Sequence, residues 1–262
     1  MIGIIGAGNM GKAIALRIGQ KVLITDIDKT KLRFSSNNRI VALKDNISLV
    51  NRSEVIILAV KPQKMKAVLK DIAPYAKTKL IISIAAGIET SFIERVLKYA
   101  KVVRVMPNMA LLVGRGISCI SAGKRTTSKD LRIVIKIFSR FGEVVGVKES
   151  LMSSVTAVSG SGPAYYFLFT DLLKKAAESC GLNKRLAAQL ARATFIGAAC
   201  SCAGTKISME DFVNKVASKG GTTEAALKVF KKRNLEAIVK QAVKAAKDRS
   251  KELKEEVWQR SA

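Results

Sequence analysis

The sequence predicts an α/β protein, with a doubly wound, mostly parallel sheet in its first half and an all-helical second half. Three observations predict this arrangement. Short apolar runs alternate with helical patterns up to about residue 150, a glycine-rich turn joins the first run to the first helical pattern, and no strand pattern follows residue 150. We therefore expect two domains, residues 1–150 and residues 151–262.

Eight apolar runs in the first half have the length and composition of buried strands. Helical patterns that separate them supply the crossovers that a parallel sheet needs. The expected strands are Ile2–Ile5, Val22–Thr25, Ile40–Ala42, Val55–Val60, Leu80–Ile84, Val102–Val105, Ile117–Ser121 and Val144–Val147, and the expected helices are Met10–Ile18, Lys61–Ile72, Thr90–Lys98 and Ser128–Phe141.

The second half reads as five helices. They are Pro163–Cys180, Asn183–Ala203, Met209–Ala217, Thr222–Lys232 and Leu235–Trp258. Gly181 is a suitable C-cap, while Asn183 and Ser208 are suitable N-caps. The helix that follows Asn183 carries a nearly continuous apolar and small-residue surface, so it needs cover on several sides. This pattern predicts a homodimer formed by the helical half.

The composition is that of an ordinary globular chain of 262 residues, with 48% hydrophobic and 25% charged residues. Four cysteines and no recognisable signal peptide argue against a disulfide scaffold and favour a cytoplasmic location. No apolar run is long enough to span a bilayer. Histidine is absent and Cys200 and Cys202 have no matching second pair, so we expect no metal site.

A formal net charge of +26 leaves two interpretations open. A nucleic-acid-binding protein would use such an excess to neutralise phosphates. However, the basic residues are spread from Lys12 to Arg260, and only 5% of the residues are aromatic, which leaves few rings to stack on bases. We therefore favour a lysine-rich solvated surface and expect no specific nucleic-acid partner.

The glycine-rich turn has the spacing of a Rossmann dinucleotide-binding fingerprint. Gly6 permits the tight turn, Gly8 lets a pyrophosphate approach the backbone, and Gly11 lets the helix pack closely on the sheet. The helix start supplies unpaired N–H groups to the phosphates. The expected cofactor-binding residues of this turn are Gly6, Ala7, Gly8, Asn9, Met10 and Gly11. A turn that merely joins strand to helix is the alternative.

Asp26 ends the second expected strand, where an acidic residue usually bonds the ribose hydroxyls of NAD. On that basis we expect NADH to be used at least as well as NADPH. Two alternatives stay open: Lys29, Lys31 and Arg33 can pair with a ribose phosphate, and an aspartate here can simply be a turn residue.

Five further motifs occur in order along the chain. They are Ala59-Val60-Lys61-Pro62-Gln63, Ser83-Ile84-Ala85-Ala86-Gly87-Ile88, Arg104-Val105-Met106-Pro107-Asn108, Val158-Ser159-Gly160-Ser161-Gly162-Pro163-Ala164-Tyr165 and Ala217-Ser218-Lys219-Gly220-Gly221-Thr222-Thr223-Glu224. Together they resemble pyrroline-5-carboxylate reductases over nearly the whole chain. Family members often carry proline at the position of Lys219, but the following glycines and Thr223 are present.

The first three of these motifs follow strands, at the edge where an open α/β sheet binds its ligand. We expect the nicotinamide side of the cofactor, NADPH or NADH, to be lined there by small and apolar groups. The residues expected to do this are Ala59, Val60, Lys61, Pro62, Ala85 and Ala86. A purely structural role for these loops is the alternative.

The resemblance implies that the substrate is the cyclic imine 1-pyrroline-5-carboxylate and the product L-proline. Backbone N–H groups at the start of the helix after Gly221 can receive the substrate carboxylate. The expected substrate-binding residues are Ser161, Gly220, Gly221, Thr222 and Thr223. The resemblance also selects Thr223, rather than Thr222, to bond the imine nitrogen, whereas capping preference alone would make Thr223 a helix cap.

A chain without histidine fits imine reduction, because a cyclic imine can enter already protonated and the protein then only positions it. The competing oxidoreductase class is the β-hydroxyacid dehydrogenases, which resemble this chain in fold. They carry a catalytic lysine in a glycine-containing helix, whereas Lys174 and Lys175 come late in the corresponding helix. In the family that the motifs resemble, helices interlock between subunits, which implies a homodimer or a larger assembly of dimers.

Overall fold

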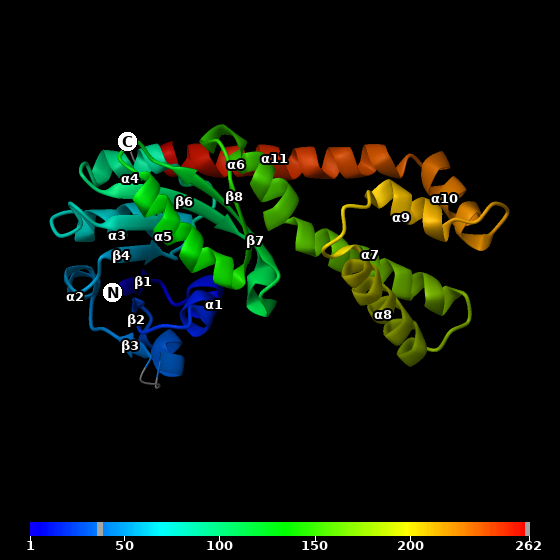
Figure 1. Ribbon diagram of the computed structural model, residues 1–262, viewed down its shortest axis with the longest axis horizontal. Coiled ribbons are helices and arrows are strands. Elements are labelled where there is room, and N and C mark those ends of the chain that lie inside the picture. The colour runs from blue at the N-terminus through cyan, green and yellow to red at the C-terminus, as the bar shows by residue number, and fades with distance from the viewer. Residues whose placement is uncertain (36–38, 260–262) are drawn as a thin grey trace. The chain divides into compact units, whose positions relative to one another are not determined.

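The computed structural model describes residues 1–35 and 39–259 (Figure 1). By its internal contacts the chain forms two compact units. The first unit comprises Met1–Ser161 and the last helix from Ala245 onward, and the second comprises Gly162–Lys244. Residues 151–161 and the end of the last helix therefore pack with the sheet, although the sequence placed them with the helical half.

The first unit is built on a sheet whose strands occur in the order β3-β2-β1-β4-β5-β6-β7-β8. The strands are β1 Ile2–Ile5, β2 Val22–Thr25, β3 Ile40–Ala42, β4 Val55–Leu58, β5 Leu80–Ser83, β6 Lys101–Pro107, β7 Gly116–Ala122 and β8 Gly142–Gly146. All neighbouring pairs are parallel except β6 and β7. The predicted doubly wound, mostly parallel sheet is confirmed.

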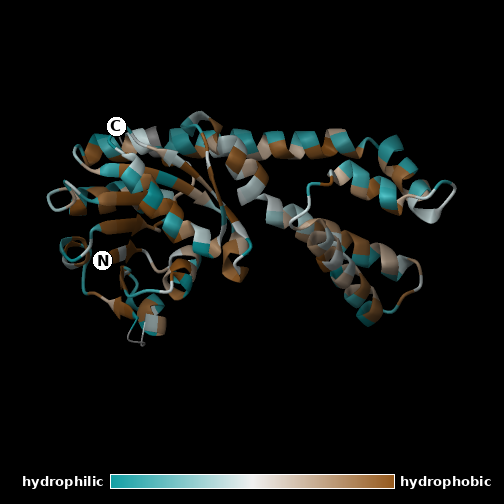
Figure 2. Ribbon diagram, viewed as in Figure 1, coloured by the Kyte–Doolittle hydropathy of each residue, from teal (hydrophilic) through white to brown (hydrophobic). Residues whose placement is uncertain are grey.

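Helices cover both faces of this sheet, which explains why its strands are continuous apolar runs (Figure 2). Strands β1, β2, β4 and β5 are buried along their whole length. Ile14 and Phe138 pack against one face, and Leu69 and Ile93 pack against the other. The sheet therefore lies between two apolar cores, and only its edges are open to ligands.

The helices of the first unit follow the predicted crossovers. They are α1 Asn9–Arg17, α2 Asn46–Asn51, α3 Met65–Ile72, α4 Thr90–Val96, α5 Ser128–Phe138 and α6 Met152–Val155, with short helical turns Lys29–Ser35 (η1), Pro62–Lys64 (η2), Met109–Val113 (η3), Ser139–Phe141 (η4) and Glu149–Leu151 (η5). Helix α2 was not predicted. Its six residues are too few to show a helical period, although Asp45 caps it by accepting a hydrogen bond from the Ser48 N–H.

The segment after α6 is also helical. Thr156–Gly160 forms a π-helical turn, η6. The hydroxyls of Thr156 and Ser159 donate to the carbonyls of Met152 and Val155, at 2.8 and 3.0 Å. These bonds to the preceding turn stabilise a wide helical turn that backbone propensity alone does not favour.

The second unit consists of helices whose predicted existence is confirmed. They are α7 Gly162–Ser179, α8 Lys184–Cys202, α9 Met209–Val216, α10 Thr222–Lys232 and the first part of α11 Leu235–Gln259. Asn183 and Ser208 accept hydrogen bonds from the N–H groups of Leu186 and Asp211, as N-caps do. Gly181 adopts a φ of +92° just beyond α7, which is typical of a glycine at a helix end.

Large apolar side chains of this second unit lie uncovered. Phe167 and Leu172 of α7 are 51% exposed, and Leu190 and Ile196 of α8 are 46% and 50% exposed. A single chain rarely leaves so many large apolar groups in water, so this surface indicates an interface between protein chains. No helix in the described part of the chain meets the length and hydropathy required to cross a membrane.

Candidate active site

The turn between β1 and α1 has the geometry that its three glycines predict. Gly6 has a φ of +106°, and a β-carbon there would lie 2.5 Å from the carbonyl oxygen of Ala59. A β-carbon at Gly11 would collide with the carbonyl oxygen of Gly6. At Gly8, by contrast, no atom lies within 4 Å of that position. Two glycines therefore serve packing, and the third leaves open space beside the backbone.

Helix α1 starts at this open space without a side-chain cap. Gly8 is its N-cap residue, and no acidic residue occupies its first turn. The N–H groups of a helix's first turn have no intrahelical acceptor and carry the positive end of the helix dipole. The arrangement fits a dinucleotide pyrophosphate, which would approach Gly8 and accept hydrogen bonds from Asn9 and Met10.

Asp26 lies beside this turn with its carboxylate directed to the backbone. One oxygen accepts a hydrogen bond from the Ala7 N–H at 2.7 Å, and the other accepts one from the Asp28 N–H at 2.8 Å. The Lys31 ammonium is 3.7 Å away. Only 9% of the Asp26 side chain is exposed, so the carboxylate belongs to the packing of the turn.

The loop after β4 touches the glycine turn. Ala59 and Val60 are half-buried and stand against Gly6, whereas Lys61 is exposed. Pro62 starts the short η2 turn, a position where its fixed φ and missing N–H cost nothing. The structure thus brings the first and second predicted cofactor loops together at the carboxyl edge of the sheet.

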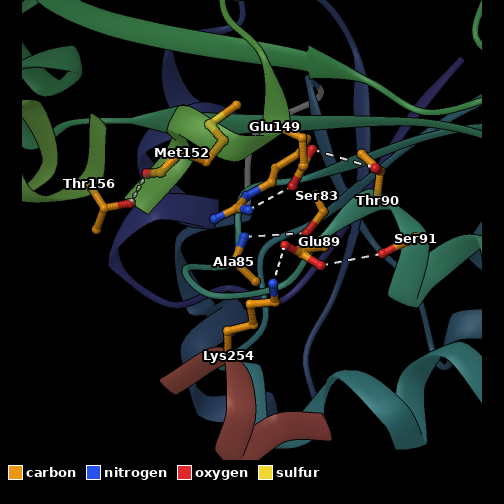
Figure 3. A network of polar contacts seen from close by, with 10 residues as sticks. Ser83, Ala85, Glu89, Thr90, Ser91, Glu149, Met152, Thr156 and Lys254 are labelled. Carbon is orange, nitrogen blue, oxygen red and sulfur yellow. Dashed lines mark hydrogen bonds and ion pairs between the residues drawn. The ribbon is translucent and has the colours of Figure 1, made fainter. Parts of the chain in front are cut away.

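The loop after β5 is fixed by polar contacts at both ends (Figure 3). The Ser83 hydroxyl accepts a hydrogen bond from the Ala85 N–H at 3.4 Å. Gly87 has a φ of +74°, and Glu89 forms a 2.6 Å ion pair with Lys254 of α11. Ala85 is buried and Ala86 is half-buried, so this loop offers backbone and methyl groups rather than reactive side chains.

A charged side chain lies inside the sheet next to this loop. Arg104 of β6 is 3% exposed, and it donates to a Glu149 oxygen at 2.7 Å. The second Glu149 oxygen accepts a hydrogen bond from the Thr90 hydroxyl at 3.5 Å (Figure 3). Within the described residues, the Nε of Arg104 has no hydrogen-bond partner. This ion pair connects β6 to the start of α4 and to η5.

Two of the predicted motifs meet at Gly160. A β-carbon there would lie 2.8 Å from the terminal carbon of Met106, so the glycine allows the strand β6 motif to approach η6 closely. Ser161 follows η6, and its N–H donates to the Thr156 carbonyl at 2.9 Å. Asn108, at the end of the β6 motif, accepts a hydrogen bond from the Ile117 N–H at 3.2 Å.

The predicted substrate loop belongs to the second unit and precedes α10. Gly220 has a φ of +73°, and its N–H donates to the Glu224 carboxylate at 2.5 Å. The Gly221 N–H donates to the Ser218 carbonyl at 3.0 Å. Both glycine amides are therefore used inside the loop, which leaves those of Thr222 and Thr223 in the first turn of α10 for a ligand.

The side chains around this loop fit an anion-binding helix start. Gly221 is the N-cap residue and provides no side-chain cap, and Thr223 is the second residue of the helix, so Thr223 does not occupy the N-cap position. The Glu224 carboxylate also pairs with Lys228 at 2.9 Å. The bond from Lys228 and the bond from the Gly220 N–H lower the pKa of Glu224.

Three features of these sites were not foreseen from the sequence. They are the inward direction of Asp26, the Arg104–Glu149 ion pair and the bond from Gly220 to Glu224. A charged residue within an otherwise apolar strand is the one signal that indicated a buried partner for Arg104. Among the described residues, no three His, Cys, Asp or Glu side chains gather as a metal site.

Comparisons with known proteins match both halves of the chain to oxidoreductases. Residues 149–253 match the family described as pyrroline-5-carboxylate reductase dimerisation, and residues 1–87 match the family described as NADP oxidoreductase coenzyme F420-dependent. The pyrroline-5-carboxylate reductase of Haemophilus influenzae is 34% identical, with 97% of each chain covered. That of Methanosarcina acetivorans is 37% identical, with 96% of this chain and 97% of the relative covered.

The chain belongs to the pyrroline-5-carboxylate reductase family. Solved structures agree: that of a pyrroline-5-carboxylate reductase from Coxiella burnetii has a TM-score of 0.90 at 34% identity, covering 96% of this chain and 97% of the other. The Plasmodium falciparum pyrroline carboxylate reductase with NADP bound has a TM-score of 0.86 at 31% identity, covering 97% of each chain. The predicted family, an NAD(P)H-dependent oxidoreductase of a C=N bond, is confirmed.

Membership in the pyrroline-5-carboxylate reductase family also confirms the predicted homodimer, through the matched dimerisation region. The uncovered apolar side chains of α7 and α8 lie within that region. A 3-hydroxyisobutyrate dehydrogenase of Mycobacterium tuberculosis is 14% identical with a TM-score of 0.52, which shows a shared fold only. The competing β-hydroxyacid dehydrogenase assignment thus gains no support beyond its fold.

Proposed function

We propose that this chain reduces 1-pyrroline-5-carboxylate to L-proline, with a cofactor site formed in the first unit by the glycine turn and the loops after β4 and β5, and with a substrate-binding loop before α10 in the second unit. The observation that carries the proposal is the open space at Gly8 beside the uncapped start of α1, in a chain that matches its relatives over nearly their whole length. When bound, the reduced nicotinamide supplies the hydride that the imine carbon receives.

In this proposal Asn9 and Met10 bind the pyrophosphate through their N–H groups. The loops Ala59–Pro62 and Ala85–Ala86 line the nicotinamide side, where small side chains allow a ring to approach the backbone. These loops have little freedom because Ala59 packs on Gly6 and the Ala85 N–H is held by Ser83. Their contribution is to orient the reactants and to exclude water, which can lower a barrier substantially.

The substrate carboxylate is proposed to bind the N–H groups of Thr222 and Thr223, since the amides of Gly220 and Gly221 are already used. The Thr223 hydroxyl bonds the ring nitrogen. The nitrogen enters protonated from solvent, so the hydride addition yields a neutral secondary amine. This amine takes a second proton from solvent, and no side chain is needed to deliver either proton. Ser161 is proposed as a further substrate contact on the basis of its motif.

The remaining proposals concern the surroundings of the enzyme. We propose that residues 151–262 serve together in dimerisation and substrate binding, although their contacts within the chain divide them between the two units. We also propose that the dimers can assemble further and that the protein works in the cytoplasm. We also propose that the charge of +26 is a solvated surface without a specific nucleic-acid partner. A titration with duplex DNA at increasing salt tests the last point, because binding without a sequence-reading motif disappears as salt rises.

The test of the proposed function is a spectrophotometric assay of the purified chain. Oxidation of NADPH and of NADH is followed in separate reactions by the loss of the absorbance of the reduced nicotinamide. We expect oxidation only when 1-pyrroline-5-carboxylate is present, with L-proline formed in equal amount. Two results would overturn the proposal. One is that neither nucleotide is oxidised at high enzyme concentration, and the other is that a 3-hydroxy acid reduces the oxidised nucleotide.

A further inference from the structure

The end of β2 is connected to the glycine turn by two hydrogen bonds. The Gly6 N–H donates to the Thr25 carbonyl at 2.8 Å, and the Ala7 N–H donates to the Asp26 carboxylate at 2.7 Å. The other oxygen of Asp26 accepts from the Asp28 N–H at 2.8 Å. The carboxylate therefore bridges the first residues of the turn and the first residues after β2.

We propose that Asp26 is a positioning residue that holds the dinucleotide turn in shape, and that it does not select NADH over NADPH. The inference rests on the proposed function only in assuming that a dinucleotide binds at Gly8. Because the family uses NAD(P)H, both nucleotides are available as probes of the same site. The proposal replaces the expectation, drawn from the position of Asp26 in the sequence, that this carboxylate reads the ribose.

A carboxylate that reads a ribose must present an oxygen to the two ribose hydroxyls. The Asp26 side chain is 9% exposed, and the backbone N–H groups of Ala7 and Asp28 hold its two oxygens toward the turn. Each oxygen can accept a second hydrogen bond, so the burial and direction of the carboxylate, not a lack of acceptor sites, keep it from the ribose. Turning it toward a ribose would leave the N–H of buried Ala7 without an acceptor, which is unfavourable for a buried donor. The same bond fixes Ala7 between Gly6 and Gly8, so its loss would disturb the site of the pyrophosphate.

The charges after β2 also fit a site that tolerates a ribose phosphate. Lys31 lies 3.7 Å from Asp26 and 3.7 Å from Asp28, so it offsets both carboxylates. Lys29 and Arg33 are exposed on the same turn, η1. The Lys29 ammonium donates to the Lys44 carbonyl at 2.6 Å, and neither side chain forms an ion pair within the described residues. Three cations against two carboxylates give η1 a positive balance, which attracts rather than repels a phosphate.

The experiment measures dissociation constants of NADH and NADPH by calorimetry, without substrate, together with the melting temperature of the unliganded protein. The variants are Asp26→Ala and Asp26→Asn. Asp28→Ala is the matched control, because Asp28 is a neighbouring carboxylate that caps η1 through Thr30 and does not touch the glycine turn. Lys31 keeps one carboxylate partner in every variant.

We expect Asp26→Ala to weaken the binding of both nucleotides at least tenfold, to change the ratio of the two constants less than threefold, and to lower the melting temperature. Asp26→Asn retains one acceptor, so both affinities should recover partly and together. Asp28→Ala should leave both constants within about threefold of the wild type, since no dinucleotide-turn contact is removed.

Two results would overturn the inference. One is a tenfold or larger shift of the ratio toward NADPH in Asp26→Ala or Asp26→Asn, which is the behaviour of a ribose-reading carboxylate. The other is unchanged affinity for both nucleotides in Asp26→Ala. Should Asp26→Ala fail to fold, the ratio in Asp26→Asn decides. If the wild type binds neither nucleotide, the proposed function fails, which is a result distinct from a shifted ratio.

Discussion

The glycine turn allows a test that separates ligand binding from packing, because a methyl group can be added at either of two positions of the same turn. Gly8→Ala places the methyl in open space, where no atom lies within 4 Å. Gly11→Ala places it against the carbonyl oxygen of Gly6 and 3.1 Å from the Ala59 β-carbon. The first change should therefore affect the nucleotide and the second the protein itself.

The magnitudes follow from these surroundings. Gly8 has a φ of −67° and a ψ of −177°, which alanine adopts without strain. The gain of about 0.4–1 kcal/mol from a stiffer unfolded chain is offset by the poorer N-capping of alanine, so unliganded stability should change by less than about 1 kcal/mol. For Gly11→Ala, overpacking costs about 1–3 kcal/mol, or roughly 2–12 °C in melting temperature for a domain of this size.

Calorimetric titration with NADPH and thermal melts of the unliganded variants provide both quantities. We expect Gly8→Ala to melt within a few degrees of the wild type and to bind NADPH at least tenfold more weakly, about 1.4 kcal/mol. Gly11→Ala should melt lower before any ligand is added. Normal NADPH binding by Gly8→Ala would refute the placement of the pyrophosphate, and a normal melt for Gly11→Ala would refute the packing argument.

Three further outcomes follow from the second unit. Thr223→Ala should lower kcat/KM for imine reduction about ten- to a hundredfold in steady-state assays, while Thr223→Ser and the control Thr222→Ala retain most of it. Because the pKa of Glu224 is lowered, its ionised form stabilises the folded state above the unfolded pKa, and this contribution is lost as the pH falls. Melts from pH 7 downward should thus separate wild type from Glu224→Gln, with the gap closing in acid. Ile196→Glu should convert the dimer to a 28.3 kDa monomer in light scattering.

The fold could be predicted because the first half buries both faces of its sheet. Val55–Leu58 and Leu80–Ser83 are continuous apolar runs for that reason, and the helices α1, α3, α4 and α5 between strands are long enough to show a helical pattern. What escaped prediction was short or depended on side-chain bonds. Helix α2 has too few residues to show a helical period. The turn η6 depends on hydrogen bonds from the hydroxyls of Thr156 and Ser159, which a sequence pattern does not show.

In the candidate site, too, residue roles that depend on spacing could be predicted from the sequence, whereas roles that depend on hydrogen-bond partners could not. Gly6, Gly8 and Gly11 could be assigned from spacing, because each glycine role depends on local backbone geometry. The direction of Asp26 depends on which N–H groups stand near it, and position in the sequence does not contain that information. Gly220 is a similar case. Its N–H was expected to bind the substrate carboxylate, whereas in the structure it donates to the Glu224 carboxylate.

The ion pair between Arg104 and Glu149 predicts an asymmetric response to removing each partner. The Arg104 side chain is 4% exposed and the Glu149 side chain 26% exposed. Glu149→Leu leaves a guanidinium buried without its carboxylate, which should cost about 3–5 kcal/mol, whereas Arg104→Met leaves a carboxylate that water can still reach and should cost less. Combining the two substitutions should restore much of the loss, because no buried charge remains. Thermal melts of the three variants test this, and equal losses in both single variants, or an additive loss in the double variant, would show that burial of Arg104 does not govern the stability of the pair.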